Sequence, residues 1–157
     1  MNLASILTPE RTCCDLEASS KKRAIEEAAG HIARTLPRLD AAEIYENLIN
    51  REKLGTTAIG HGIAIPHCRM QNCDEIVGGL FKLRQPINFE AFDDQPVQIM
   101  FVLLVPAEEV EDHLATLAML AERFESEKFR EHLLQATSDR ELYERATQDP
   151  VPNARLA

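Results

Sequence analysis

The sequence lacks any apolar run long enough to cross a membrane. Its longest run extends over residues 97–105 and includes Gln98, whereas a membrane-spanning helix needs about 20 apolar residues. The N-terminus has neither a basic start nor a long apolar stretch, so the sequence predicts no secretory signal. These absences indicate a cytoplasmic protein with no membrane insertion.

An excess of basic residues is also lacking. The sequence has 17 lysines and arginines against 26 aspartates and glutamates, which gives a formal net charge of −9 at pH 7. General binders of nucleic acids or anionic membranes need a basic surface, so the composition argues against both kinds of partner. It suits a protein that meets other proteins transiently.

Two common signatures of bound groups are absent. The four cysteines, at positions 13, 14, 68 and 73, form no Cys-x-x-Cys pair, and in a cytoplasmic protein we expect them to be free thiols. His67, Cys68 and Cys73 lack a fourth ligand at regular spacing, which argues against zinc. No glycine-rich nucleotide-binding loop is present. The sequence therefore predicts neither a metal nor a cofactor.

Helical periodicity dominates both ends of the chain. Apolar residues recur at spacings of three and four from Ser20 to Leu36, after a capping sequence at Asp40, and in three segments beyond Pro106. The length of 157 residues fits a single domain with a substantial core. We expect this domain to span residues 1–147, followed by a flexible C-terminal tail at 148–157, which has two prolines and no apolar period.

The middle of the chain has the pattern of strands. Residues 75–83 and 97–105 predict strands, and the second is apolar almost throughout, as expected for a strand covered on both faces. Residues 56–65 predict two short strands or a hairpin-like excursion, and residues 8–20 predict irregular backbone. Helices before, between and after apolar strands predict a layered α/β domain.

The most distinctive segment is Gly60-His61-Gly62-Ile63-Ala64-Ile65-Pro66-His67. Its glycines permit positive φ and close backbone approach, while Pro66 fixes its own φ and favours an extended Ile65. The motif therefore presents His67 at the end of a short apolar run on a stiffened backbone. A neutral imidazole has one lone-pair nitrogen that can act as nucleophile, ligand or base. On these residues alone, a strand end that happens to carry a histidine is an equal alternative.

The longer stretch from Arg51 to His67, Arg-Glu-Lys-Leu-Gly-Thr-Thr-Ala-Ile-Gly-His-Gly-Ile-Ala-Ile-Pro-His, resembles the active-site segment of enzyme IIA proteins. These belong to the mannitol/fructose class of the bacterial phosphoenolpyruvate-dependent phosphotransferase system. The stretch is most similar to the nitrogen-related branch, which has no attached sugar permease, and the resemblance covers nearly the whole chain. It implies a single layered α/β domain with a central mixed β-sheet flanked by helices. It also implies that His67 carries a phosphoryl group.

A phosphohistidine carrier needs a nucleophilic imidazole, a group that holds the ring, and donors for the phosphoryl oxygens. His67 supplies the nucleophile. His113 lies in the apolar stripe of its predicted helix, where burial requires a polar partner, and spacing alone favours a structural histidine. The resemblance instead implies a second active-site histidine, because residues 105–107 (Val-Pro-Ala) and His113-Leu114 match the family's context.

Candidate phosphate-binding residues precede the motif. Arg51 lies in the last turn of its predicted helix, where a cation is favourable to the helix dipole, and its planar fork also suits phosphoryl oxygens. The family has an arginine at this place, so the resemblance favours the second interpretation. Thr56 and Thr57 are candidates to add hydroxyl or backbone donors, with a purely structural role as an equal alternative.

Two residues depart from the family pattern. His61 stands where asparagine is commonest, and an imidazole there has the means to shift the pKa of His67 or to contact a partner. Cys68 stands where glycine is frequent, which leaves redox sensitivity open. His31 and His132 lie in predicted helices and are expected at the surface or the edge of the core.

The resemblance implies a function in phosphoryl transfer between proteins. His67 would accept a phosphoryl group from a small HPr-type carrier, charged by enzyme I from phosphoenolpyruvate, and phosphorylation would then regulate partners. Regulated proteins in this family include potassium-transport and kinase systems. One alternative is a sugar-specific enzyme IIA that passes phosphate to a fructose- or mannitol-type enzyme IIB. A second is a regulatory binding module that is never phosphorylated, and a weak third is a metal hydrolase, for which no ligand spacing is visible.

Overall fold

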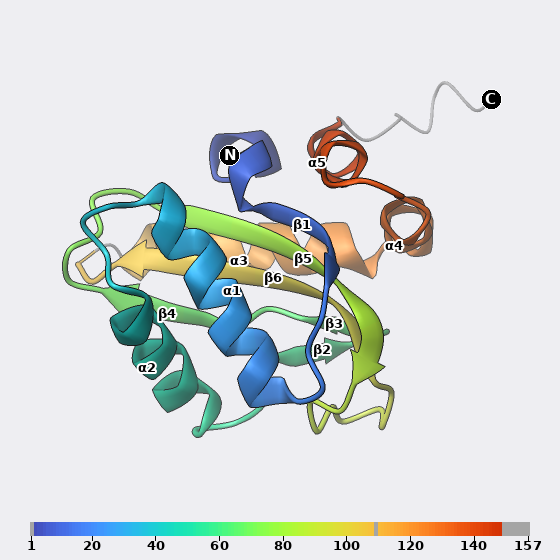
Figure 1. Cartoon of the computed structure of the whole chain (residues 1–157), viewed down its shortest axis with the longest axis horizontal. Coiled ribbons are helices and arrows are strands. Elements are labelled where there is room, and N and C mark those ends of the chain that lie inside the picture. The colour runs from blue at the N-terminus through green and yellow to red at the C-terminus, as the bar shows by residue number, and fades with distance from the viewer. Residues whose placement is uncertain (1, 109, 149–157) are drawn as a thin grey trace.

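A computed structural model describes residues 2–108 and 110–148 of the chain. The described residues form two short 3₁₀ helices, η1 and η2, together with the helices and strands labelled in Figure 1. In chain order the elements are η1 (Leu3–Ser5), η2 (Pro9–Arg11), β1 (Thr12–Leu16), α1 (Lys21–Thr35), α2 (Ala41–Glu52), β2 (Ala58–Gly60), β3 (Ile63–Ala64), β4 (His67–Met70), β5 (Val77–Ile87), β6 (Val97–Pro106), α3 (Val110–Glu125), α4 (Glu127–Leu134) and α5 (Asp139–Thr147).

The strands of the described part form one mixed sheet in the order β1-β5-β6-β3-β2, and β4 also pairs with β6. The long strands β5 and β6 are antiparallel, whereas β1 runs parallel to β5 and both β3 and β4 run parallel to β6. Every residue of β6 except Gln98 is buried. The prediction of a central strand covered on both faces is therefore confirmed.

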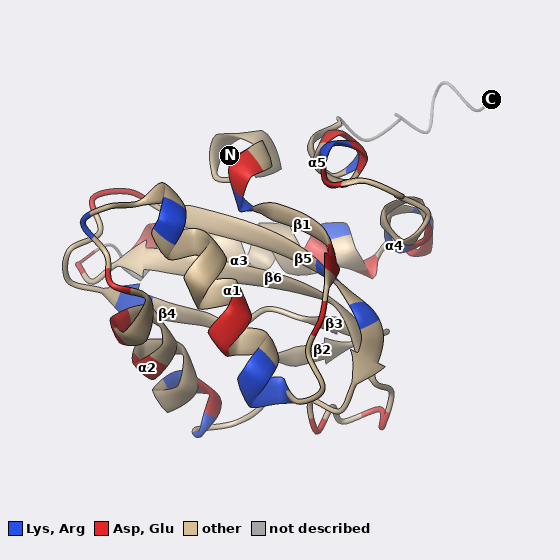
Figure 2. Ribbon diagram, in the orientation of Figure 1, with Lys and Arg blue, Asp and Glu red and all other residues tan. Residues whose placement is uncertain are grey.

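Helices cover both faces of the sheet. In Figure 1, α1 passes in front of the sheet and α3 lies behind it. The apolar side chains of α1 and α2 pack on one face, and those of α3, α4, α5 and η1 pack on the other. Charged residues lie mainly on helices and connecting segments, and β6 carries none (Figure 2). The predicted layered α/β arrangement is confirmed.

Local sequence explains where the helices begin. Ser20 has extended backbone, and its hydroxyl accepts the N–H of Arg23 at 3.2 Å, so it caps α1 as its residue type favours. Asp40 caps α2 in the same way through the N–H of Glu43. Within α1, fully buried residues recur at the spacing of one helix face, namely Ala24, Ile25, Ala28, Ala29 and Ile32.

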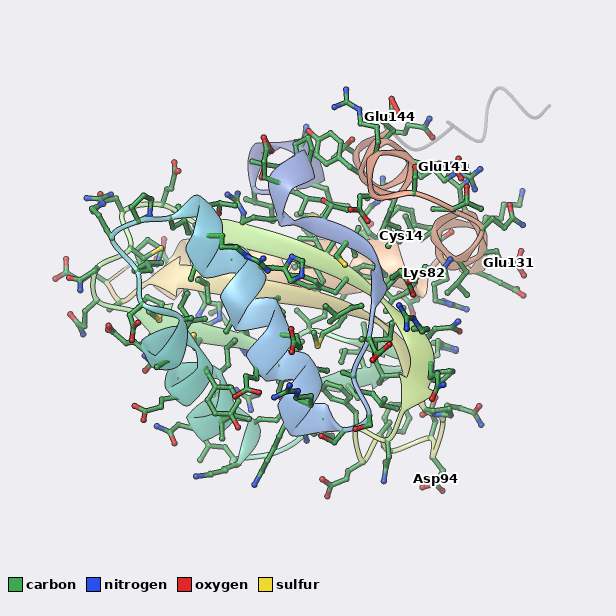
Figure 3. The ribbon with its side chains drawn as sticks, viewed as in Figure 1. Cys14, Lys82, Asp94, Glu131, Glu141 and Glu144 are labelled. Carbon is green, nitrogen blue, oxygen red and sulfur yellow. The ribbon has the colours of Figure 1, made fainter. Side chains whose placement is uncertain are left out.

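Hydrogen bonds from Lys82 connect the end of α4 to the sheet. The Nζ of Lys82 on β5 donates to the carbonyl oxygens of Leu134 (2.6 Å) and Ala136 (2.9 Å), at the end of α4. The Sγ–H of Cys14 on β1 donates to the same Ala136 oxygen at 3.2 Å. Figure 3 shows Lys82 and Cys14 in this region, between the sheet and the last two helices. These contacts satisfy carbonyl groups that the end of a helix leaves without partners.

The structure differs from the sequence expectation at two strands. Residues 8–20 were expected to be irregular, and this prediction is wrong for β1, an edge strand whose middle residues are partly buried or exposed and so show no apolar alternation. The short apolar run before His67 was expected to be followed by loop, whereas a further strand, β4, begins at His67 because the chain resumes pairing with β6 directly after Pro66. The predicted tail at 148–157 lies outside the described residues except for Gln148.

A tight turn joins β2 to β3 and sets up the approach to His67. Both central residues have positive φ, 58° at His61 and 79° at Gly62, as in the type I′ turns that suit antiparallel hairpins. The side chain of Asp93 accepts the N–H of His61 at 2.9 Å and holds this turn. The prediction of two short strands here is confirmed.

Candidate active site

His67 is the first residue of β4 and is half-buried. Its Nδ1 lies 2.7 Å from the carbonyl oxygen of Ile65. Because a carbonyl oxygen only accepts hydrogen bonds, Nδ1 carries the proton and donates it to that oxygen. In the neutral ring this leaves the lone pair on Nε2, which is the nucleophilic nitrogen.

The backbone that presents His67 is held on both sides. The N–H of Ile65 donates to the carbonyl oxygen of Thr57 at 3.0 Å, and the carbonyl oxygen of Pro66 accepts the N–H of Leu103 at 2.9 Å. Ile65 itself is buried, and Pro66 fixes its own φ. The carbonyl oxygen that orients the imidazole is therefore fixed by the sheet and by the segment that precedes β2.

The surroundings keep His67 neutral. Burial lowers the pKa of His67 below the ordinary histidine value of 6.5, and the charge of Arg51 lowers it further. The hydrogen bond to the Ile65 carbonyl and the charge of Glu52 act in the opposite direction but do not cancel the burial. At pH 7 the ring is consequently in its neutral form, which is the nucleophilic form.

His113 lies in the first turn of α3 and brings a second imidazole to His67. The two ring centroids are 5.4 Å apart and the rings are inclined by 66°. The Nε2 atom of His113 is buried and finds no hydrogen-bond partner among the described residues. Burial lowers the pKa of His113, and the charges of Arg69, Arg51 and, when it is protonated, His67 lower it further. Among the described residues, this buried nitrogen beside His67 therefore has no protein partner that a ligand would have to displace.

Arg51 lies in the last turn of α2, as predicted, and its Nη1 donates to the carbonyl oxygen of Gly55 at 3.0 Å. Its charge acts on the pKa values of both His67 and His113. The structure therefore brings Arg51 close enough for its charge to act on both imidazoles. The bond to Gly55 is formed at a half-exposed position, so water replaces it at little cost.

The two threonines follow α2 but have protein partners of their own. The Thr56 hydroxyl donates to the Phe89 carbonyl oxygen at 2.6 Å and accepts the N–H of Ala58. The Thr57 hydroxyl and N–H both donate to the carboxylate of Glu52, at 2.6 and 2.9 Å. These bonds stabilise the segment before β2. Contact of either threonine with a phosphoryl group stays a prediction.

Three charged residues near the site were missed at the level of sequence. Glu52 is a buried carboxylate with 6% exposure, and Lys21 from the start of α1 pairs with it at 2.9 Å. A basic residue is unfavourable at the start of a helix, so the sequence leaves a partner or solvent open for Lys21 and favours solvent, since nothing local indicates a partner 31 positions away. Arg69 lies two residues after His67 on β4. A strand places residues i and i+2 on the same side, and that rule was the signal that could have found it.

The departures from the family pattern have simple structural consequences. His61 occupies the turn between β2 and β3, with a left-handed backbone for which asparagine and glycine are better suited. Cys68 is buried, and burial raises its pKa to about 12. Its thiolate is therefore scarce at neutral pH, which argues against the redox sensitivity left open for this residue.

Residues 2–108 and 110–148 hold no group of three or more His, Cys, Asp or Glu side chains placed to bind a metal ion. Within the same residues no helix is sufficiently long and apolar to cross a membrane.

Comparison with known proteins finds relatives over most of the chain. A family model described as "Phosphoenolpyruvate-dependent sugar phosphotransferase system, EIIA 2" matches residues 5–148. The chain is 42% identical over 144 residues to a protein of Pseudomonas aeruginosa named nitrogen regulatory protein, and this match covers 92% of the chain and 94% of that protein.

Solved structures extend this similarity to the fold. The crystal structure of nitrogen regulatory protein IIA-Ntr from Neisseria meningitidis superposes with a TM-score of 0.86 at 37% identity, over 92% of this chain and 99% of that one. The crystal structure of IIA mannitol from Escherichia coli superposes with a TM-score of 0.73 over 88% of this chain and 97% of that one. At 20% identity the second match shows the fold alone. The predicted mixed sheet flanked by helices, of the mannitol/fructose enzyme IIA type, is thus confirmed.

Proposed function

This chain belongs to the enzyme IIA type 2 family of the phosphoenolpyruvate-dependent sugar phosphotransferase system, and on that premise we propose that it is a phosphohistidine carrier of the nitrogen-related branch. His67 accepts a phosphoryl group from an HPr-type carrier protein. The phosphorylation state then determines which regulated transport or kinase proteins the chain binds. A cytoplasmic location belongs to the proposal, because free thiols such as those of this chain persist in a reducing compartment.

The orientation of the His67 ring is the observation that carries this proposal. The bond from Nδ1–H to the Ile65 oxygen supports Nε2 as the attacking atom. In the proposed step, the Nε2 lone pair attacks the phosphorus of the donor's phosphohistidine. A new N–P bond forms as the donor's N–P bond breaks, and the donor imidazole leaves with that electron pair.

Positive charge near His67 supports stabilisation of the transferred group. The phosphoryl oxygens carry negative charge throughout the transfer, and positioned cations and donors supply most of the catalysis in such reactions. We assign Arg51 to this task because its guanidinium has donors in a planar fork. His113 is assigned beside it, since its buried Nε2 lacks a partner among the described residues and, once protonated, donates to a phosphoryl oxygen.

Exposed apolar side chains near the site support transient docking of a carrier. Leu54, three residues after Arg51, is 83% exposed, and Leu114, directly after His113, is 63% exposed. Apolar side chains beside a reactive group fit a surface that a partner covers. A phosphoryl group on His67 adds about −1.5 to −2 charges at this surface, by analogy with phosphoserine. That change is enough to alter the choice of partner.

The proposal is tested by transfer from phosphoenolpyruvate through enzyme I and an HPr-type carrier, followed by intact mass. We expect one acid-labile phosphoryl adduct on the wild type, none on His67→Ala, and an unchanged adduct on His132→Ala, which alters a histidine on α4. An unmodified wild type with a competent donor would refute the carrier function and leave a binding module that is never phosphorylated. Onward transfer to a fructose- or mannitol-type enzyme IIB would instead indicate the sugar-specific alternative.

A further inference from the structure

A buried ion pair between Lys21 and Glu52 contacts the segment that precedes β2. Glu52 is the last residue of α2 and only 6% exposed. Its Oε1 accepts the Thr57 hydroxyl at 2.6 Å, and its Oε2 accepts both the Thr57 N–H and the Nζ of Lys21 at 2.9 Å. Burying a carboxylate is costly unless it is paired and hydrogen-bonded, and here both oxygens are engaged.

Lys21 forms its main ion pair with the carboxylate of Glu52. Its side chain is 17% exposed, and its Nζ lies 5.3 Å from the centre of the Phe89 ring. The second carboxylate near Nζ belongs to Glu90, which is 3.8 Å away and 78% exposed. A solvated partner at that distance contributes little, so the buried Glu52 is the main counter-ion of Lys21.

Hydrogen bonds connect this pair to the reactive ring. Glu52 fixes Thr57 through two bonds, and the carbonyl oxygen of Thr57 accepts the N–H of Ile65 at 3.0 Å. The carbonyl oxygen of Ile65 in turn accepts the Nδ1–H of His67 at 2.7 Å. The same segment carries Gly55, whose oxygen binds Arg51. One buried carboxylate thus anchors the segment that serves both the nucleophile and its arginine.

We propose that Glu52 is a positioning residue for His67 and that Lys21 is its neutralising partner. Glu52 acts through Thr57 and Ile65, and it maintains the ring orientation in which Nδ1 holds the proton and Nε2 faces the donor. The inference rests on the proposed function, because it assigns this pair to the same transfer step.

Lys21 has a separate task in the phosphorylated state. A phosphoryl group on Nε2 brings up to two negative charges toward a site that already contains the buried charge of Glu52. Like charges in a partly buried environment interact strongly. Lys21 offsets the charge of Glu52, so the carboxylate positions the ring without repelling the group that the ring receives.

The variants are chosen to separate positioning from folding. Glu52→Ala removes all three bonds, whereas the double variant Glu52→Gln with Lys21→Met removes both charges and keeps an amide oxygen for Thr57. Glu46→Gln changes an exposed acid on the same helix and is the matched control. For each protein we would record the nitrogen-15 spectrum of the His67 ring without phosphate, and then the rate of transfer from a phosphorylated HPr-type carrier.

In Glu52→Ala we expect the His67 ring to populate both neutral tautomers. The rate of phosphoryl transfer should fall on the order of 10- to 100-fold, which is the effect of misplacing a reacting group by about 1 Å. The double variant is expected to regain most of the Nδ1–H tautomer and of the rate, and Glu46→Gln to match the wild type. A Glu52→Ala protein with the wild-type tautomer and a rate within about twofold of Glu46→Gln would overturn the inference.

Lys21→Met tests the charge-neutralising part of the inference even if Glu52→Ala does not fold. This variant retains the bonds from Thr57 to Glu52, so we expect an unchanged tautomer but a phosphoryl-transfer equilibrium displaced toward the donor. An unchanged equilibrium would contradict the role of Lys21. The tautomer is measured without any phosphoryl donor, so its result does not depend on the proposed function. A wild type that accepts no phosphoryl group would refute the proposed function. An unaltered tautomer in Glu52→Ala would refute only this inference.

Discussion

Replacing Arg51 by alanine should slow phosphoryl transfer to His67 by about the contribution of one hydrogen bond to a charged group. In the unphosphorylated protein Arg51 donates one bond to the Gly55 oxygen, and in the proposed transition state its fork turns to the phosphoryl oxygens. A hydrogen bond to a charged group contributes about 1.5–3 kcal/mol. Each 1.36 kcal/mol is tenfold in rate, so transfer should fall about 10- to 150-fold.

A second readout of the same variant does not depend on a phosphoryl donor. The charge of Arg51 lowers the pKa of His67 and of His113, so its removal should raise both pKa values. The pH below which transfer declines should consequently move upward in Arg51→Ala. The pKa values are measured from imidazole chemical shifts during a pH titration, and the rate from the time course of the mass adduct.

Arg51→Lys separates charge from geometry. It keeps the positive charge but loses the fork, so we expect near-normal pKa values for His67 and His113 together with a partial loss of rate. The reasoning would be refuted by an Arg51→Ala protein that transfers within about twofold of the wild type with both pKa values unmoved. Equal pKa shifts in the lysine and alanine variants would also contradict it.

Three further outcomes are expected. Burial lowers the pKa of His31, His67 and His113, so as the pH decreases these residues are protonated in the unfolded chain before they are protonated in the folded protein. The free energy of unfolding should therefore keep its full value above about pH 6.5 and fall as the pH decreases through the lowered pKa values. Urea unfolding at several pH values checks this, and a flat profile from pH 7.5 to 5 would contradict it. His61→Asn should raise the unfolding free energy, because asparagine followed by glycine is the preferred pair where both central residues of a type I′ turn have positive φ. A loss measured in the same assay would speak against this account of the turn. Gly78→Ala should lower the melting temperature and reduce the free energy of unfolding by about 1–3 kcal/mol, since the added Cβ would lie 2.8 Å from a ring carbon of Phe101. A melting curve identical to that of the wild type would show that this ring moves freely.

The parts of the fold that sequence predicts well are those set by local pattern. The helix α1 follows from apolar spacing after two serines, either of which can cap it and of which Ser20 does so, and β6 follows from an apolar run. The motif that ends in His67 combines residue types with few alternative uses. In each case the information lies within a few neighbouring residues, where periodicity and backbone chemistry act directly.

The parts that sequence does not predict depend on distant pairing. The strand β1 has partly exposed side chains at the edge of the sheet, and only its pairing with β5 makes it a strand. The residue Lys21 is in a position that favours solvent, yet it meets a carboxylate from another helix. For Thr57, the sequence leaves a structural and a phosphate-binding role equally open, and the structure reveals its bonds to Glu52. Such contacts are decided by topology rather than by local composition.

The most direct test of the central claim is to identify the nitrogen atom that carries the phosphoryl group. The nitrogen-15-labelled protein would be phosphorylated from phosphoenolpyruvate through enzyme I and an HPr-type carrier, and its imidazole spectrum recorded with and without phosphorus decoupling. The ring orientation predicts a bond from phosphorus to Nε2 of His67, with Nδ1 still protonated against the Ile65 oxygen. Phosphorus on Nδ1 of His67, or on any other histidine, would contradict the account.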